Sequence, residues 1–490
     1  MTATGSAALT AADPRPRDRA ARAVLAGCLV AVFLQMLDLT MVNTALPALT
    51  AGLGAGDSGQ LLIASAYSLA FACGLLPAAR LGDTVGRRRI YLTGMAGLIL
   101  AAVWSAAAHG TAEMVAARGA QGLCAALVSA QTLAVIASTF DRSRHPRVFG
   151  LYGGAAGLAA ITGPLIAGVL LGTDPLGIGW RAVFLVHVPL GLLALALMRR
   201  GLPADGPAVA VRLDTTGILL ATPALLGLLY PLTRAPEIGW PPTSVATVAL
   251  ASALALVFLA HQRRVRASGA TPLLRVDLFA DRGFAVGAVL MVLSSAMLAA
   301  FPLTVSVFLQ TGMGLSATES GLMIVPFALG AAAGALSSPL LTERWGPRGL
   351  AVGATVFAVA IGAVALLIDP GANRVDTAAL ATPVVLAGLG AGWFAAPLPS
   401  VLIADIAPEA AGAASGTVPT LQQIGSALGP AAFGAVLYAG IAAGRVADPA
   451  TRAATVAHTY ATAFTTVLWV IACLAAVLAA VSLALPARGR

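Results

Sequence analysis

The chain contains very little charge. Only 10% of its 490 residues are Asp, Glu, Lys or Arg, 59% are hydrophobic, and the mean hydropathy is +0.90. A soluble globular domain carries about 25% charged residues, so this composition excludes that class and is typical of a polytopic membrane protein. We expect most of the chain to lie in lipid, with polar segments too short to form domains of their own.

Lysine is absent, and all 29 basic residues are arginine. A phosphate-binding P-loop of the form GxxxxGK[ST] needs its lysine, and the chain contains no such stretch. The sequence therefore excludes ATP hydrolysis at a Walker site, and the energy for any work must come from elsewhere. We expect no cofactor.

Cysteine and histidine are scarce. Cys28, Cys73, Cys124 and Cys473 stand singly in apolar segments, and the five histidines are equally scattered. This spacing fits no metal site, so we interpret these residues as packing or loop residues. An intramembrane enzyme would need clustered His, Cys or paired acids within the spans, and the sequence offers none; we expect a protein that is not an enzyme.

What the chain does have is about fourteen apolar stretches, each long enough to cross a bilayer as a helix of about 20 residues. An even number of spans puts both termini on the same side. The predicted fold class is an all-α polytopic membrane protein with helices over residues 24–46, 60–80, 90–108, 112–136, 147–171, 180–198, 214–233, 243–261, 284–310, 318–341, 349–368, 378–403, 412–440 and 462–485.

Arginine is concentrated before the first helix and after the even-numbered helices up to the tenth. Positive charge marks the cytoplasmic side, so we expect both termini to be cytoplasmic and the protein to lie in the cell membrane. The connection after the twelfth helix, with Asp405 and Glu409, is the exception. The net charge of +9 follows this topology and does not indicate nucleic-acid binding. Because about thirteen spans follow the first, we do not expect it to be a cleaved signal peptide.

Asp38 is an acid within the apolar run from Ala23 to Pro47. A carboxylate at such depth costs several kcal/mol, about 2.5–3.5 on insertion scales, and is a functional hypothesis by default. Counted from the predicted helix ends at 1.5 Å per residue, Asp38 lies roughly 12 Å deep and Arg118 roughly 9 Å deep. The two side chains are therefore expected at similar depths.

Two short stretches, residues 79–89 (ARLGDTVGRRR) and 339–348 (PLLTERWGPR), resemble each other when Gly86 is aligned with Gly346. Each follows the second helix of a six-helix unit, as in a transporter with two parallel halves. We expect a cytoplasmic tail over 1–22, a six-helix half over 23–200, a linker with two inserted helices over 201–268, a second half over 269–486, and a cytoplasmic tail over 487–490.

Residues 37–47 read LDLTMVNTALP and match LDxTxxNxALP at every fixed position. Residues 118–122 are similar to RxxQG, residues 157–168 resemble a signature associated with antiporters, and residues 180–191 resemble WRxxFxxNxPxG with His187 in place of Asn. Residues 79–89 resemble GxLaDxxGRrx, with Ala79 in place of the first Gly. The chain thus resembles the major facilitator superfamily over nearly its whole length, specifically its fourteen-helix drug:proton antiporter family.

The resemblance implies a fold in which the first and fourth helices lie beside one cavity, where Asp38 and Arg118 are expected to meet. Burial favours a neutral acid and a nearby guanidinium favours a carboxylate, so a change in geometry would bind or release a proton. We interpret the pair as the proton-coupling site; the alternative is that the two residues form a permanent structural ion pair or cap backbone groups.

The resemblance also assigns gating to the loop after the second helix, where an acid would latch the outward-facing state; the gating set is Asp83, Gly86, Arg87 and Glu343. The alternative explanation is that the arginines only set the orientation in the membrane and that Gly86 only permits a tight turn. An antiporter helix with a kink and close helix contacts is expected at Gly157, Gly163, Pro164 and Gly168.

A cavity for a lipophilic substrate is expected to use aromatic, soft and amide side chains, with interhelical packing or hydrogen bonding as the alternative for each. This set is Gln35, Thr40, Asn43, Tyr67, Gln121, Gln131, Met297, Phe301, Gln310, Trp393 and Gln423.

The predicted function is proton-coupled export of lipophilic small molecules such as drugs or antibiotics, by a monomer that contacts only lipid, substrate and protons. The alternative is a symporter or facilitator that imports a small nutrient on the same fold.

Overall fold

The computed structural model is built from long helices, and no strand occurs in the residues it describes. These residues are 16–141, 144–175, 177–203, 214–270, 272–346, 348–371, 376–403, 408–444 and 452–483. Within these residues, fourteen helical segments are long and apolar enough to cross a membrane. The predicted fold class is confirmed.

Three spans consist of two pieces each: α6 with α7, α10 with η3, and α13 with α14. The elements are α1 (Pro16–Leu53), α2 (Asp57–Val85), α3 (Arg87–Ala107), α4 (Thr111–Thr139), α5 (His145–Thr173), α6 (Arg181–Leu185), α7 (His187–Gly201), α8 (Thr215–Ile238), α9 (Pro242–Ala267), η2 (Val276–Ala280), α10 (Arg282–Ser306), η3 (Val307–Gly312), α11 (Ala317–Trp345), α12 (Arg348–Leu367), α13 (Thr377–Ala395), α14 (Leu398–Ile403), α15 (Pro408–Ala443) and α16 (Arg452–Ser482).

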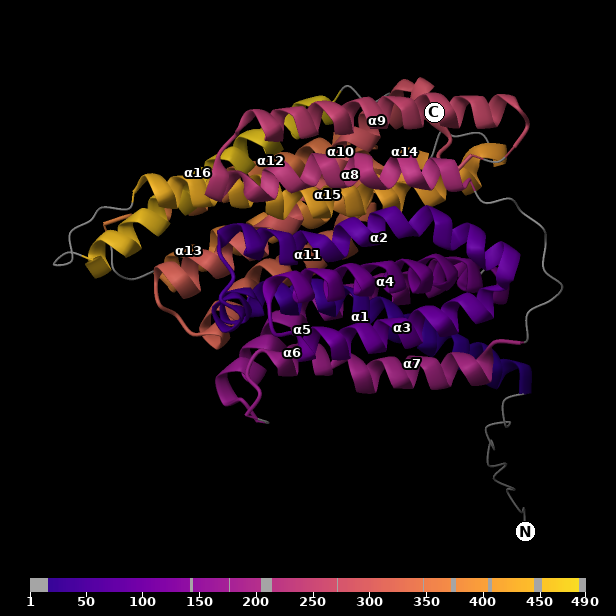
Figure 1. Cartoon of the computed structure of the whole chain (residues 1–490), viewed down its shortest axis with the longest axis horizontal. Coiled ribbons are helices and arrows are strands. Elements are labelled where there is room, and N and C mark those ends of the chain that lie inside the picture. The colour runs from indigo at the N-terminus through magenta and orange to yellow at the C-terminus, as the bar shows by residue number, and fades with distance from the viewer. Residues whose placement is uncertain are drawn as a thin grey trace, which may run out of the picture.

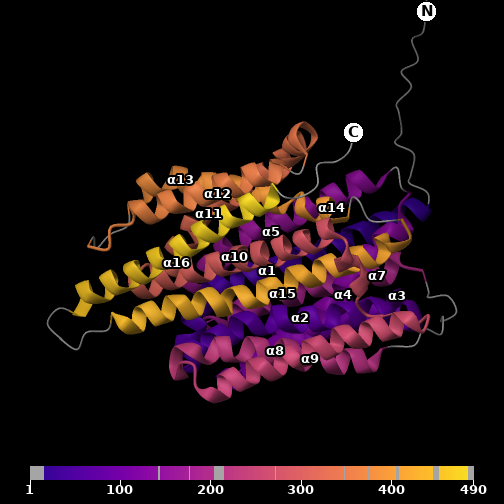
Figure 2. The ribbon, with the colours of Figure 1, turned by 90° about the horizontal axis from the view of Figure 1, so that it is seen from above.

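The helices form two bundles and an added pair. Helices α1–α7 pack mainly with one another, as do α10–α16, and Figure 1 shows the two groups as the indigo-to-purple and the orange-to-yellow layers. The pair α8 and α9 lies beside the two bundles, and α8 packs against α2 of the first bundle and α15 of the second. In Figure 2 this pair occupies one edge of the molecule, and α12 and α13 occupy the opposite edge. We call the bundles the N-half and the C-half.

Glycine allows the helices within each bundle to pack closely. A Cβ built on Gly122 of α4 would lie 2.2 Å from the carbonyl oxygen of Tyr67 in α2, and one on Gly388 of α13 would lie 2.0 Å from that of Phe327 in α11. In membranes helices associate through such small residues, because lipid provides no hydrophobic drive between them. The α2–α4 and α11–α13 contacts occupy corresponding places in the two halves.

The first helix is longer than predicted. It continues through Pro47 to Leu53, whereas the sequence pattern predicts its end at residue 46. A proline inside a membrane helix removes one backbone donor, here the one that would bond the carbonyl oxygen of Asn43, and a membrane helix can continue through such a site. Asp38 therefore lies about four turns from the end of α1, deeper along the helix than the predicted 12 Å.

The two aligned glycines occupy the same structural position. Gly86 is the single residue between α2 and α3, with φ of 113°, and Gly346 follows α11 with φ of 56°. Positive φ is accessible to glycine without steric cost, so each glycine permits a sharp reversal between consecutive helices.

The halves meet toward one membrane face, the face where α1 ends and α2 begins, which we call the far face. The contacting helices are α2 with α15, α5 with α11, and α1 with α10. Hydrogen bonds join the halves here between Gln310 Nε2 and the Thr44 carbonyl (2.9 Å), between Thr318 Oγ1 and the Gly168 carbonyl (2.7 Å), and between the Tyr438 hydroxyl and Gln60. The far face is thus closed by direct contact between the halves.

Candidate functional site

Asp38 and Arg118 meet in the interior of the N-half. Arg118 Nη1 of α4 donates to Asp38 Oδ2 of α1 across 2.6 Å, and the two residues are each only 1% exposed. Gln121, one turn after Arg118, donates from Nε2 to Asp38 Oδ1 at 2.9 Å and accepts from Arg118 at 2.8 Å. Both carboxylate oxygens are therefore hydrogen-bonded, as a buried charge requires.

Two more side chains complete this site. The Tyr67 ring of α2 lies under the Arg118 guanidinium, with the central carbon 4.7 Å from the ring centroid. His187 of α7 is 1% exposed, and its Nε2 lies 3.1 Å from Asp38 Oδ1. We call these five residues the Asp38 cluster: Asp38, Tyr67, Arg118, Gln121 and His187.

The break between α6 and α7 explains how His187 reaches the cluster. Pro189 has no N–H with which to bond the Leu185 carbonyl, and the helix is interrupted at Val186. His187 begins the next helix, and its Nδ1 lies 3.1 Å from the carbonyl oxygen of Phe184. The imidazole is thus fixed by the backbone on one side and faces Asp38 on the other.

Sequence reasoning missed this role for His187. Its one signal was the histidine in the WRxxFxxNxPxG stretch where the pattern has Asn. The structure also differs from the expected position of the ion pair, because the cluster is sealed inside the N-half and does not line an open cavity.

The predicted gating residues lie at the near face, where α1 begins. Arg87 donates to Asp83 at 3.3 Å within the same half, and both side chains are more than 40% exposed. Arg87 also donates to the carbonyl oxygen of Ala134 in α4. Gly86 makes the turn between α2 and α3. The side chain of Glu343 lies outside the described part of the structure. These contacts join α2, α3 and α4 and do not involve the C-half.

The glycines predicted for the antiporter helix differ in what they do. A Cβ on Gly163 would lie 1.9 Å from Thr40 Oγ1, and one on Gly168 would lie 2.8 Å from the Thr318 Cα, so both permit close helix contact. Pro164 lies within α5, and its carbonyl contacts Gly321 of α11. Gly157, in contrast, has no atom within 4 Å of an added Cβ. Close packing does not account for Gly157.

Most of the predicted cavity side chains make interhelical hydrogen bonds. Those of the N-half are Gln35 with the Ala125 carbonyl, Thr40 with the Ala159 carbonyl and Gln131 with the Ala78 carbonyl. In the C-half, Trp393 donates to Ser337, and Gln310 joins the halves. Asn43 is half-buried, and Gln423 is buried with an Oε1 that has no hydrogen-bond partner.

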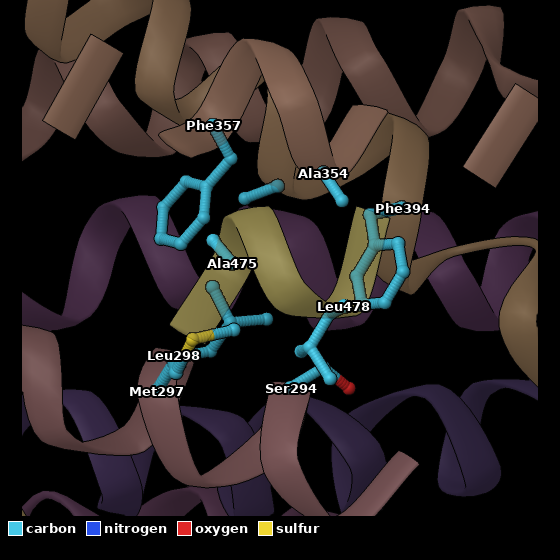
Figure 3. Close-up of a pocket in the computed structure, with 9 residues that line it drawn as sticks. Ser294, Met297, Leu298, Ala354, Phe357, Phe394, Ala475 and Leu478 are labelled. Atoms are coloured by element: carbon cyan, nitrogen blue, oxygen red, sulfur yellow. The ribbon is translucent and has the colours of Figure 1, made fainter. Parts of the chain in front are cut away.

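Met297 belongs to the core of the C-half. Figure 3 shows its side chain facing those of α12, α13 and α16 around a void of about 10 Å³. A void of that size holds a single water at most, so it cannot be a substrate site.

Phe301 lines a larger cavity of about 390 Å³ in the C-half, toward the far face. Its walls come from α10, η3, α11, α12, α13 and α16, and they include the ring pairs Phe301–Phe327 and Phe308–Phe464, with centroids 4.7 and 4.5 Å apart. Glu319 is its one charged lining residue, and its carboxylate is occupied by the Ser316 backbone and hydroxyl. This far-face cavity has the volume and apolar lining typical of small-molecule sites.

Within the described ranges, no group of three or more His, Cys, Asp or Glu side chains is placed to hold a metal ion.

The profile of the Major Facilitator Superfamily matches residues 28–430. The chain belongs to the Major Facilitator Superfamily. As a member of this superfamily it is a multi-pass membrane transporter and not an enzyme.

Proteins similar to this superfamily member are named for antibiotic transport or antibiotic resistance. It is 33% identical over 432 residues to a probable actinorhodin transporter of Streptomyces coelicolor, covering 88% of this chain and 74% of the relative. It is 35% identical over 412 residues to a puromycin resistance protein of Streptomyces alboniger, covering 83% and 80%. The fourteen-helix drug-efflux branch suggested by the LDLTMVNTALP stretch is confirmed by these matches.

Among solved structures, the fold is similar to a bacterial homolog of the human lysosomal transporter Spinster in an inward-facing, unoccupied conformation. The TM-score is 0.69 with 15% sequence identity, over 95% of this chain and 97% of the other. The similarity establishes the major facilitator fold.

Proposed function

We propose that the protein exports lipophilic small molecules across the cell membrane in exchange for protons, by alternating access. The observation that carries the proposal is the buried Asp38–Arg118 pair in a chain without a Walker lysine. An ionisable pair inside a membrane span is costly and marks a proton or ion pathway by default.

The contacts within the Asp38 cluster support a coupling between the protonation of Asp38 and the arrangement of the helices. The Asp38 carboxyl is only 1% exposed, so its ionised form depends on the donors Arg118 and Gln121. A movement of α4 relative to α1 would remove these donors and favour protonation. A conformational change of the N-half would therefore change the number of protons bound.

The arginine distribution supports a cytoplasmic near face. With that orientation, the contacts that close the far face correspond to a state sealed on the outside. The Asp83–Arg87 contact within the N-half fits this state, because Asp83 is then not engaged as a latch between the halves.

One proton is sufficient for useful export. A proton entering down about 150 mV supplies roughly 3.5 kcal/mol, at about 2.3 kcal/mol per 100 mV. At 1.4 kcal/mol per decade this energy supports roughly a 300-fold gradient of a neutral substrate.

The substrate class is inferred from the relatives and from the far-face cavity. The relatives are named for actinorhodin and puromycin, both antibiotics. The far-face cavity of about 390 Å³ has phenylalanine walls that suit a small apolar or aromatic ligand. We propose that this cavity contacts substrate on its way out.

Flux in membrane vesicles tests the proposal. Inside-out vesicles from an efflux-deficient host that produces the protein are energised by respiration, and uptake of labelled puromycin and of ethidium is measured. We expect uptake that an uncoupler abolishes and that Asp38→Asn lacks. The matched control Asp376→Asn, at the exposed start of α13, should retain uptake because Asn also caps a helix.

Uptake confined to right-side-out vesicles would contradict export and favour a symporter or facilitator. Equal uptake by wild type and Asp38→Asn would leave export standing and remove Asp38 from coupling.

A further inference from the structure

His187 presents a buried nitrogen that no hydrogen bond satisfies. Its Nδ1 lies 3.1 Å from the Phe184 carbonyl oxygen, which can only accept, so Nδ1 carries a hydrogen. In a neutral imidazole the other nitrogen, Nε2, then bears a lone pair. Nε2 is buried without an aligned hydrogen-bond partner and lies 3.1 Å from Asp38 Oδ1.

This arrangement leaves a place for one proton. A lone pair on Nε2 facing a carboxylate oxygen is repulsive, and a proton on Nε2 makes the same contact an attractive ion pair. Both oxygens of Asp38 already accept hydrogen bonds, Oδ2 from Arg118 and Oδ1 from Gln121. Nε2 is therefore the open basic atom of the Asp38 cluster in this conformation.

We propose that His187 is a second proton-binding site of the transport cycle, which takes up a proton at Nε2 while Asp38 serves as its counter-ion. A hydronium ion gives its proton to Nε2 and leaves as water, and an N–H bond is formed. The proposal rests on the proposed function, because the proton concerned is the one that drives export.

The charge balance explains what this proton does. With neutral His187, Arg118 and Asp38 cancel; with an imidazolium, two cations share one buried carboxylate. The imidazolium competes with Arg118 for Asp38 and leaves an uncompensated positive charge in the N-half, which favours a more hydrated arrangement. Protonation of His187 thus loosens the Asp38–Arg118 bond and promotes the change of conformation.

Titratable and charged side chains near His187 come from several helices. Asp38 belongs to α1, and Arg118, the cation of the Asp38 cluster, belongs to α4. Tyr91 of α3 and residues of α7 belong to one apolar cluster. The Tyr91 hydroxyl donates a hydrogen bond to the Gly27 carbonyl oxygen. Arg181 of α6 contacts the Trp180 ring and donates to the Ala108 carbonyl. Asp38 is the carboxylate placed to balance an imidazolium at His187.

Nitrogen-15 NMR of histidine-labelled protein tests the site without a substrate. The chain has only five histidines, so the His187 signals are identified by their loss in His187→Asn, and His109→Asn identifies an exposed histidine for reference. We expect neutral His187 to be the Nδ1–H tautomer and to gain a proton on Nε2 when the sample is acidified. A proton on Nε2 in the neutral ring, or shifts that do not change on acidification, would overturn the proposal.

A transport measurement tests the role in coupling. In proteoliposomes, His187→Asn and His187→Gln should lose puromycin accumulation driven by a pH gradient and retain exchange of labelled for unlabelled puromycin, which needs no gradient. Gradient-driven accumulation at the wild-type level would overturn the coupling role, and loss of both activities in both variants would assign His187 to structure. If the wild type itself shows no gradient-driven accumulation, the proposed function fails, while the NMR titration still decides the proton site.

Discussion

Arg118 Nη1 lies 2.6 Å from Asp38 Oδ2, although the two residues are 80 positions apart and belong to different helices. Each side chain neutralises the other at a position that water does not reach. Removing one partner of such a pair leaves a buried charge and costs about 3–5 kcal/mol, whereas removing both can be nearly neutral.

The first expectation follows from this asymmetry. Arg118→Leu should be strongly destabilised, and the double variant Asp38→Asn with Arg118→Leu should be more stable than Arg118→Leu alone. Thermal unfolding of the purified variants in detergent measures the difference. A double variant whose loss equals the sum of the two single losses would show that the side chains do not interact.

The second expectation concerns the contact between α5 and α11. In Gly168→Ala, the new Cβ would lie 2.8 Å from the Thr318 Cα, so the helices must separate and closure of the far face is impaired. We expect transport to be lost while the protein remains in the membrane. Gly154→Ala is the matched control on the same helix, because an added Cβ there has nothing within 4 Å. Transport measured per amount of inserted protein compares them, and equal losses would refute the packing argument.

The third expectation tests the far-face cavity. Ala381→Phe adds a ring to the wall of this cavity, whereas Ala379→Phe adds the same ring at an exposed position of the same helix that does not line it. We expect Ala381→Phe to reduce resistance of an efflux-deficient host to large lipophilic compounds, and Ala379→Phe to leave it unchanged. Minimum inhibitory concentrations against a graded series of compound sizes provide the measurement. The cavity has no part in transport if both variants protect equally.

The fourth expectation concerns pH and the inserted helix pair. Burial acts to raise the pKa of Asp214, but hydrogen bonds from His261, the Gly217 N–H and Gln262 hold this pKa below its ordinary value of 3.8. A lowered pKa in the folded state means that the stabilisation is complete above that ordinary value and is lost as the pH falls through the lowered pKa.

Asp214→Asn should therefore remove part of the acid-induced loss of stability and cost about 1 kcal/mol at neutral pH, where the charge-assisted bonds are present. Thermal unfolding between pH 7 and pH 3 measures both effects, with Asp376→Asn as the control for an exposed helix start. Identical pH profiles of wild type and Asp214→Asn would contradict the assignment.

Local patterns in the sequence predicted the spans well, because a helix in lipid must satisfy its own backbone and so needs a continuous apolar run. They were less reliable at helix ends. Pro47 indicated a stop, but α1 continues to Leu53, since whether a proline ends a membrane helix depends on its neighbours in space. The π-helical turn η3 and the break at Val186 were likewise not visible in the pattern of apolar residues.

For the functional-site residues, too, some features could be predicted from the sequence and others depended on packing. Asp38 and Arg118 were identifiable because a charge inside an apolar run is energetically unusual wherever the run folds. Gly157 and Gly168 belong to one sequence signature, yet only Gly168 is in close contact with another helix. Which face of an apolar helix meets a neighbour cannot be read from a segment that is apolar on all sides.

The sequence by itself determined that this protein is a helical membrane protein of about fourteen spans, because composition and run length leave an apolar chain no other stable state in lipid. Its motifs, through their resemblance to the major facilitator superfamily, indicated a transporter. It also determined that Asp38 needs a partner. Only the tertiary structure decided that the Asp38–Arg118 pair is sealed within the N-half and that His187, from a distant helix, faces it with an unsatisfied nitrogen. The physical reason is that an interaction between charges depends on distance and burial, and packing of α1, α4 and α7 sets both.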